Sequence, residues 1–403
     1  MRGVFAPTLG LAALLALSGS APAAEPLANA ETVRMTSKVL GEERTILVST
    51  PRGYGQGSAR YPVLYLTDGD AHLLHTRGTV DFLVRNGLMP DVVIVGIANT
   101  DRTRDLTPTR GFGFGADGTP VLAETSGGAG KFLEFFEKEL IPYVEATYRT
   151  VPCRVFAGHS LGGLFALDAL VERPGLFNAT IAASPSLNWD HDVILDRVSK
   201  FLDGRKELRH TLFVTMADEE EGDPSPTRFE RLRKLLKGTK AAGFAWGAMP
   251  MPDEDHGSVV LRSHYWGLRK VFDGWRLPRD RKAGGFAGSV EDLGKHYAQL
   301  SERLGYPVPP PEPVVNQVGY QHLLRKDVKG ALPFFRKNVE LYPDSANVHD
   351  SLGEALEAAG ALEEALASYE RAVEIATRRG DPRLPVFARN RDRLAAAREK
   401  RPG

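Results

Sequence analysis

Strand-like and helix-like segments alternate through the middle of the chain, and this alternation limits the fold more than any other feature. Helical apolar spacing at 131–147 and 161–173 lies between short runs rich in apolar and β-branched residues. Several runs are continuously apolar, which is typical of central strands covered on both faces. We therefore expect an α/β domain with a mostly parallel central sheet and helices on both faces. The expected strands are 45–49, 63–66, 92–97, 154–157, 179–183, 212–216 and 244–246.

A G-x-S-x-G motif, Gly158-His159-Ser160-Leu161-Gly162, directly follows one of these strands and directly precedes a helical stretch. Strand, tight turn and helix form the context of a nucleophile elbow, in which glycines let the backbone crowd around a strained serine. The bare motif is common, so a glycine-rich turn with a solvated serine is the alternative. We expect Ser160 to be a nucleophile and His159 to face the substrate pocket.

A nucleophilic serine needs a base, and in this type of sheet the chain order is serine, acid, histidine. His256 is the best candidate because it lies in a loop after the last expected strand and before an apolar helix. His210 precedes a strand and should lie at the wrong end of the sheet, and His264 falls within a helix. His191 lies in a polar loop and is a candidate for lining the pocket. The alternative for His256 is an ordinary surface loop histidine.

The acid of a triad orients the imidazole and stabilises its cation. An acidic run follows the strand at 212–216, at the expected catalytic end of the sheet. Glu219 is the favoured acid, and Asp218 and Glu220 are the alternatives. An acidic run is often only a solvated surface, so the alternative for each of these residues is an exposed carboxylate without a catalytic role.

Two backbone N–H groups are expected to form an oxyanion hole. One belongs to Leu161, which follows the nucleophile. The other is assigned to Asp70, in the turn at 67–70 after an expected strand. This assignment requires the Asp70 carboxylate to point away, because its negative charge would oppose the oxyanion. The alternative is a plain turn that ends the strand.

Two further segments are expected near the pocket. Ser184 and Trp189 bound a segment that follows the strand after the nucleophile helix, and we expect both to wall the acyl pocket. Residues 111–130 are rich in glycine but lack the Gly-Lys-Ser/Thr ending of a phosphate loop. They are interpreted as a substrate loop or lid, or equally as a plain loop.

Four segments resemble the putative-esterase family of α/β-hydrolases, which includes S-formylglutathione hydrolases, mycolyl transferases and enterochelin-type siderophore esterases. The resemblance covers roughly residues 30–275 and is nearest to exported or siderophore-esterase-like members. It implies the α/β-hydrolase fold, Ser160 as nucleophile, His256 as base, an acid after the seventh strand, and no metal or other cofactor. The segments are LYLTDGD at 64–70, NTDRTRDLTP at 99–108, AGHSLGG at 157–163 and SPSLNW at 184–189.

The first 24 residues have the pattern of a secretory signal peptide. Arg2 precedes an apolar run at 9–17, and small residues fill 18–24. The run is too short to span a membrane, and no later segment reaches the length of a spanning helix. We therefore expect a periplasmic or secreted protein without stable membrane insertion. The single cysteine, Cys153, suits an oxidising compartment because it has no partner with which to mispair.

The C-terminal quarter is alanine-rich and helical, with a 34-residue period that resembles tetratricopeptide repeats. Two units are expected, at 312–345 and 346–379, with a capping helix at 384–399. The resemblance implies a groove for a protein partner, and the alternative is packing on the catalytic domain or self-association. The pairs that carry the period are Gly319 and Gly353, Ala331 and Ala365, and Phe335 and Tyr369.

The balanced charge and the length of the chain bear on its partners and its domains. The chain has 51 basic and 51 acidic residues, and this balance disfavours a nucleic-acid-binding protein. We expect a signal peptide at 1–24, a catalytic domain at 25–280, a helix and Pro-rich linker at 281–311, and a small all-α domain of tetratricopeptide-like repeats at 312–400. The predicted function is an exported serine esterase for small-molecule esters, including siderophore-type lactones. The alternatives are an acyltransferase with the same acyl-enzyme, and a repeat-based binding scaffold whose hydrolase domain is inert.

Overall fold

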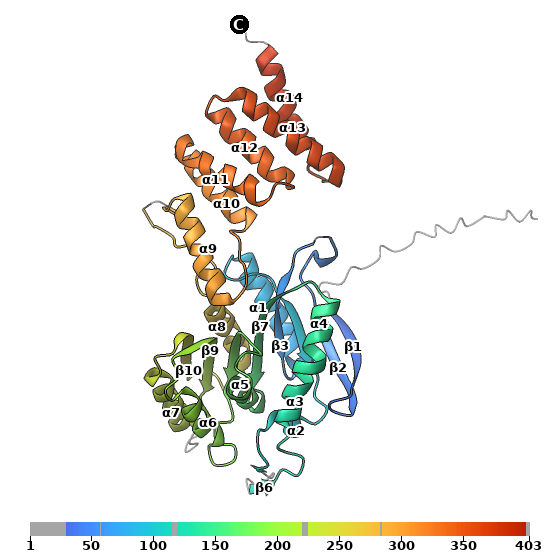
Figure 1. The fold of residues 1–403 in the computed structure, drawn as a ribbon, viewed down its shortest axis with the longest axis vertical. Helices are drawn as coiled ribbons and strands as arrows, with labels where there is room; N and C mark the ends of the chain where they lie inside the picture. The colour runs from blue at the N-terminus through green and yellow to red at the C-terminus, as the bar shows by residue number, and fades with distance from the viewer. Residues whose placement is uncertain (1–29, 57, 115–119, 220–224, 283, 400–403) are drawn as a thin grey trace, which may run out of the picture.

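The computed structural model describes residues 30–56, 58–114, 120–219, 225–282 and 284–399. The expected signal peptide therefore lies outside the described residues. The described chain forms an α/β domain followed by an all-helical part that extends from one end of it (Figure 1). Among the described helices, none combines the length and the apolarity needed to cross a bilayer.

An eight-stranded sheet forms the centre of the α/β domain, in the order β1-β2-β4-β3-β7-β8-β9-β10. The pairs β1–β2 and β2–β4 are antiparallel, and every other neighbouring pair is parallel. The mostly parallel sheet expected from the sequence is thus confirmed. The strands are β1 (Ala30–Ser37), β2 (Glu42–Ser49), β3 (Tyr61–Leu66), β4 (Val93–Ile97), β7 (Thr150–His159), β8 (Ala179–Ala183), β9 (Glu207–Ala217) and β10 (Ala242–Met251).

Helices cover both faces of this sheet, because the central strands bury both of their faces. Along β3, Tyr65 packs into one core with α5, whereas Leu64 and Leu66 pack into the opposite core with α1 and α8. The helices of the domain are η1 (Tyr54–Gln56), α1 (Gly69–Arg85), α2 (Arg102–Leu106), α3 (Ala129–Phe135), η2 (Phe136–Leu140), α4 (Ile141–Thr147), α5 (Leu161–Glu172), α6 (Val193–Leu202), α7 (Ser225–Gly238) and α8 (Val259–Val271).

A two-stranded hairpin, β5 (Phe112–Phe114) and β6 (Pro120–Leu122), lies within the glycine-rich segment expected to be a loop or lid. Figure 1 shows β6 at the end of the molecule opposite the C-terminal helices. The charged side chains just before this hairpin brace the fold: Arg104 contacts Glu42 at 2.6 Å and Asp105 at 2.8 Å.

The C-terminal part is a series of antiparallel helices with equivalent contacts 34 residues apart in the sequence. A Cβ on Gly319 would lie 2.7 Å from the ring of Phe335, and a Cβ on Gly353 would lie 2.6 Å from the ring of Tyr369. A glycine facing an aromatic ring therefore lets each helix pair approach closely. The helices are α9 (Val290–Leu304), α10 (Glu312–Leu324), α11 (Val328–Leu341), α12 (Ala346–Ala358), α13 (Leu362–Arg379) and α14 (Leu384–Glu399).

Candidate active site

The expected nucleophile elbow lies between β7 and α5. Ser160 joins them with φ 59° and ψ −115°, a left-handed conformation that is strained for a residue with a side chain. The flanking glycines make room for this turn. A Cβ on Gly158 would lie 2.2 Å from the carbonyl oxygen of Gly162, and a Cβ on Gly162 would lie 2.4 Å from Oγ1 of Thr67. The motif therefore has the backbone geometry that exposes a serine at the carboxyl end of a central strand.

Glu219 and His256 meet at the same end of the sheet. Nδ1 of His256 lies 2.9 Å from Oε1 of Glu219, and a carboxylate can only accept, so Nδ1 carries the donated proton. The hydroxyl of Ser184 donates to the same oxygen at 3.0 Å and itself accepts from the backbone N–H of Ala217 at 3.2 Å. This arrangement fixes the carboxylate, and it leaves Nε2 of His256 as the basic nitrogen of the ring.

The alternative acids occupy other positions. The Asp218 side chain is exposed, and its backbone N–H donates to the carbonyl oxygen of Glu254 at 2.8 Å. That bond ties the end of β9 to the loop that carries His256. Glu220 lies outside the described residues.

The carboxylates that precede the loop histidine shape its loop. Asp255 accepts hydrogen bonds from the backbone N–H groups of Gly257 at 2.8 Å and Ser258 at 2.7 Å. These bonds lower the pKa of the Asp255 carboxyl below its usual value. The carboxylate of Glu254 accepts from the guanidinium of Arg262 at 2.9 Å. Both acids are therefore engaged in holding the loop.

Ser160 and His256 are not joined by a hydrogen bond in the described part of the chain. The hydroxyl of Ser160 instead lies 3.2 Å from the hydroxyl of Ser186. The side chain of His256 is 45% exposed. Hydrogen bonds between a nucleophile and its base often tighten only when substrate binds.

The two expected oxyanion donors lie in the first turns of two helices. Asp70 is the second residue of α1, and Leu161 is the first residue of α5. First-turn amides have no partner within their own helix, and they carry the positive end of the helix dipole. Because β3 and β7 are adjacent parallel strands, the helices that follow them begin at the same edge of the sheet. The Asp70 side chain is exposed.

A partly buried ion pair supports this edge. Arg102 Nε donates to Oδ1 of Asp68 at 2.6 Å, and Asn99 donates to the same oxygen at 2.6 Å. Burial raises the pKa of the Asp68 carboxyl, but the hydrogen bonds and charge of Arg102 more than offset it, so the net pKa is lowered. Arg102 also donates to the carbonyl oxygen of His159 at 2.9 Å, which ties the pair to the elbow.

Five histidines form a row behind the elbow. Nε2 of His159 lies 2.6 Å from the carbonyl oxygen of His256, and the two rings are 4.8 Å apart. Farther back, His72 contacts His75 at 3.1 Å, and the rings of His75 and His264 stack at 5.4 Å. Burial, and next the charges of neighbouring histidines, lower the pKa values of His159 and His75 to about 4. Within the described residues, no group of histidines, cysteines or acids is placed to hold a metal ion.

A cavity of about 610 Å³ opens beside the elbow. It is bounded by the loop that follows β8 and begins at Ser184, by the starts of α5 and α7, and by strand β5. His159 is not among its described lining residues, and Nε2 of His159 contacts the backbone carbonyl oxygen of His256. The lining residues are Thr103, Phe112, Ala123, Leu161, Ser184, Pro185, Ser186, Asn188, Trp189, Asp190, His191, Glu219, Ser225, Arg228 and His256.

One wall of this cavity is a strained turn. Three successive residues, Asp190 to Asp192, have φ values of 44°, 55° and 64°, which are left-handed conformations that favour glycine. The turn is braced from α7, where Nε of Arg228 donates to Asp192 and Arg231 contacts the same carboxylate at 3.6 Å. Nη1 of Arg228 is buried and has no hydrogen-bond partner among the described residues. This wall thus combines backbone strain with an uncommitted donor.

The structure departs from the sequence expectations at His210 and gives Ser184 a second role. His210 lies within β9 rather than before it, and is 3% exposed between Thr180 and the carbonyl oxygen of Phe177. Ser184 lines the cavity as expected but also positions Glu219. Ser186 lies in the segment expected to wall the pocket, whereas nothing in the local sequence marks Arg228 as a lining residue.

Comparison with known proteins gives consistent matches. Residues 37–242 match the family model described as Putative esterase, about half of the chain. The chain is 33% identical over 204 residues to ferri-bacillibactin esterase BesA of Bacillus subtilis, which covers 46% of this chain and 68% of that protein. It is 32% identical over 298 residues to the siderophore triacetylfusarinine C esterase of Aspergillus fumigatus, which covers 64% of this chain and 98% of that protein.

Two solved structures extend the comparison. An IroE-like serine hydrolase from Shewanella oneidensis superposes with a TM-score of 0.66 at 29% identity, over 78% of this chain and 100% of its own. An uncharacterised protein from Capnocytophaga ochracea superposes with a TM-score of 0.63 at 17% identity, over 91% of this chain and 100% of its own, which shows a shared fold. On this fold and these matches, the chain belongs to the putative-esterase family of α/β-hydrolases and is an esterase.

Proposed function

We propose that this esterase hydrolyses carboxylic esters through a triad of Ser160, His256 and Glu219 and a covalent acyl-enzyme. The observation that carries the proposal is the 2.9 Å contact between Nδ1 of His256 and Oε1 of Glu219. It lies beside a serine in a strained elbow, which is the arrangement that nucleophilic ester hydrolysis requires.

In the first half-reaction, Ser160 Oγ attacks the ester carbonyl carbon while Nε2 of His256 takes the hydroxyl proton. Glu219 stabilises the imidazolium that results. The backbone N–H groups of Leu161 and Asp70 hold the oxyanion of the tetrahedral intermediate. The ester C–O bond then breaks, and His256 returns the proton to the departing alkoxide.

In the second half-reaction, His256 removes a proton from water, and the resulting hydroxide attacks the acyl-enzyme carbonyl. The acid product leaves as the C–O bond to Ser160 breaks, and the serine recovers its proton from His256. An alcohol in place of water would give acyl transfer by the same steps, so the acceptor decides between esterase and acyltransferase chemistry.

Siderophore-type lactones are the proposed substrate class. Support comes from the two curated relatives, of which one is named a ferri-bacillibactin esterase and the other a siderophore triacetylfusarinine C esterase. The cavity of about 610 Å³ is within the range of small-molecule pockets. Its wall offers an aromatic face from Trp189 and donors from His191 and Arg228, which suit a substrate rich in carbonyl and hydroxyl oxygens.

The remaining parts of the chain are proposed to serve location and contacts. The signal-peptide pattern at 1–24 supports export to the periplasm or the medium. The repeated helix pairs from 312 onward support binding of a protein partner or self-association. Figure 1 places these helices at the end of the molecule away from β6, so they would act without lining the catalytic cavity.

The substrate class is tested by product analysis. The mature protein is incubated with an enterobactin-type trilactone and with short nitrophenyl esters, each with and without an alcohol acceptor. The products are separated by chromatography and identified by mass spectrometry. Stepwise linear hydrolysis products from the trilactone support the proposal. Ester products with the added alcohol would instead favour an acyltransferase, and turnover of neither substrate class would contradict the proposed reaction.

A further inference from the structure

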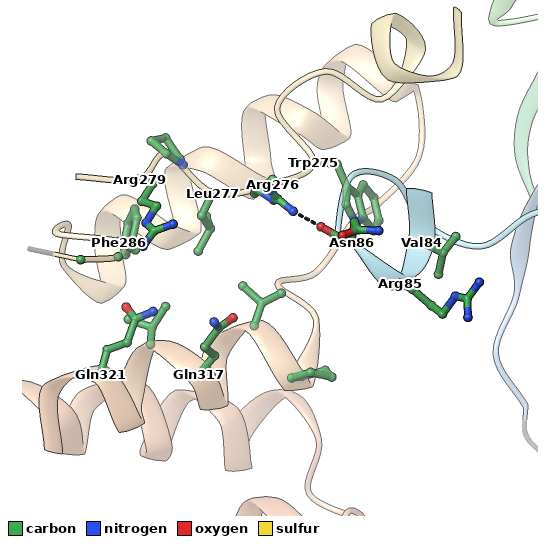
Figure 2. Close-up of a pocket in the computed structure, with 17 residues that line it drawn as sticks. Val84, Arg85, Asn86, Trp275, Arg276, Leu277, Arg279, Phe286, Gln317 and Gln321 are labelled. Carbon is green, nitrogen blue, oxygen red and sulfur yellow. Dashed lines mark hydrogen bonds between the residues drawn. The ribbon is translucent and has the colours of Figure 1, made fainter. Parts of the chain in front are cut away.

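A second cavity, of about 600 Å³, lies at the junction of the α/β domain and the helical part (Figure 2). Its walls come from the end of α1 and the turn after it, from the connection between α8 and α9, and from α10. In Figure 2, Gln317 and Gln321 of α10 face the connection, from which Leu277 and Arg279 extend toward them. The helical part closes this cavity, so the cavity exists only in the two-part protein.

The charged side chains that line the cavity are all cationic, beside the neutral Asn86, Gln317 and Gln321. Arg85, Arg276 and Arg279 line it, and none of its described lining residues is an aspartate or a glutamate. None of the three arginines takes part in an ion pair with another described residue. Arg85 donates to the backbone carbonyl oxygen of Asp81, and Arg276 donates to that of Asn86. Nη2 of Arg325 lies 4.0 Å from the point where a Cβ on Gly284 would sit, which brings another guanidinium to the rim.

The floor of the cavity is apolar, with Trp275, Leu277, Phe286 and Val318 among its lining residues. Phe286 is 9% exposed and Val318 is 2% exposed, so this floor continues the core beneath it. Among the described residues, the carboxamide oxygen of Gln321 has no hydrogen-bond partner.

We propose that this junction cavity binds an amphipathic anion, that is, a small molecule with a carboxylate head and an apolar body. Arginine matches a carboxylate by paired N–H donors and is easily desolvated, so the unpaired rim guanidiniums suit the head group. The apolar floor suits the body. The volume is that of a small-molecule pocket, and such pockets occur preferentially at domain interfaces. This site lies outside the catalytic cavity and does not depend on the proposed triad.

The test is calorimetric titration of the full-length mature protein with octanoate and with its neutral analogue octanamide. Octanoate should bind saturably, and octanamide should bind at least about tenfold more weakly, because the amide lacks the negative charge that the rim arginines would bind. Arg279→Gln should weaken octanoate about tenfold. The matched control is Arg281→Gln, which removes a neighbouring exposed cation that does not line the cavity, and it should change octanoate affinity less than twofold.

A second readout locates the binding. The indole N–H resonance of Trp275, assigned by its loss in Trp275→Phe, should shift with octanoate in the unmodified protein and in Arg281→Gln. Equal binding of octanoate and octanamide would overturn the proposal, since charge would then have no role. Equal losses in Arg279→Gln and Arg281→Gln, no saturable binding, or an unmoved Trp275 resonance would overturn it as well.

Discussion

Oε1 of Glu219 lies 2.9 Å from Nδ1 of His256, across 37 residues of sequence. The contact joins the end of β9 to the loop before α8, and the backbone bond from Asp218 to Glu254 holds the two segments together. Of the acidic run that begins at Asp218, Glu219 is therefore the carboxylate that contacts the histidine. Its position follows from the backbone bond between Asp218 and Glu254, not from the number of acidic residues in the run.

Glu219→Gln should reduce kcat/KM for nitrophenyl esters by about 10³-fold, because an amide cannot stabilise the imidazolium and favours the wrong tautomer. Asp218→Asn is the matched control, since its side chain is exposed, and it should retain activity within about twofold. Steady-state kinetics of the two variants checks the prediction. Similar losses in both would show that the run acts by its charge alone.

Gly162→Ala should destabilise the elbow, because its Cβ would lie 2.4 Å from Oγ1 of Thr67. Overpacking of this kind typically costs about 1–3 kcal/mol and would also displace the serine. Gly175→Ala adds the same methyl group where nothing lies within 4 Å. The free energy of unfolding in urea and the rate of ester turnover should both fall in Gly162→Ala. Both should stay unchanged in Gly175→Ala. An unaffected Gly162→Ala would mean that the elbow is not tightly packed.

Arg228→Gln should lower kcat/KM by about tenfold, mainly through KM, since it frees the strained Asp190–Asp192 turn and removes the unpartnered Nη1 donor from the wall. Arg231→Gln removes the other arginine on Asp192 but no residue of the cavity lining. It should change kcat/KM by less than about threefold. If both variants lose activity equally, the arginines serve only to brace the turn.

Stability should fall as the pH drops from about 6.5 to about 4. Burial, and then the charge of His72, depress the pKa of folded His75 to about 4, below its ordinary value of 6.5. The unfolded chain therefore takes up this proton first, and the stabilisation present above pH 6.5 is lost as the pH falls through the folded pKa. His75→Gln should flatten the slope by at most about 1.4 kcal/mol per pH unit. Parallel unfolding free energies of the two proteins across this window would contradict the assignment.

The sheet could be predicted from the sequence because its central strands are continuous apolar runs, as in β4 and β8. Among the elements that the sequence patterns miss, β1 and α1 have clear physical reasons. β1 is an edge strand with mostly exposed side chains, so it carries no apolar signal. The sequence predicts a turn at 67–70, but α1 begins there, directly after β3, because the left-handed φ of 54° at Asp68 lets the helix start without a loop.

The elbow could be predicted because its strand, turn and helix are contiguous in the sequence. The pairing of Glu219 with His256 was favoured by chain order, whereas the role of Ser184 could not be foreseen. Its hydroxyl reaches Glu219 only because β8 and β9 are neighbours in the sheet. Arg228 likewise meets Asp192 only through the packing of α7 on α6. Such contacts depend on tertiary geometry, which local patterns do not encode.

The central claim, that Ser160 is the nucleophile, is tested most directly by the ester turnover of Ser160→Ala. The account predicts that kcat on nitrophenyl esters falls by at least about 10³-fold while the unfolding midpoint stays near that of the unmodified protein. Turnover that survives the substitution unchanged would contradict the account.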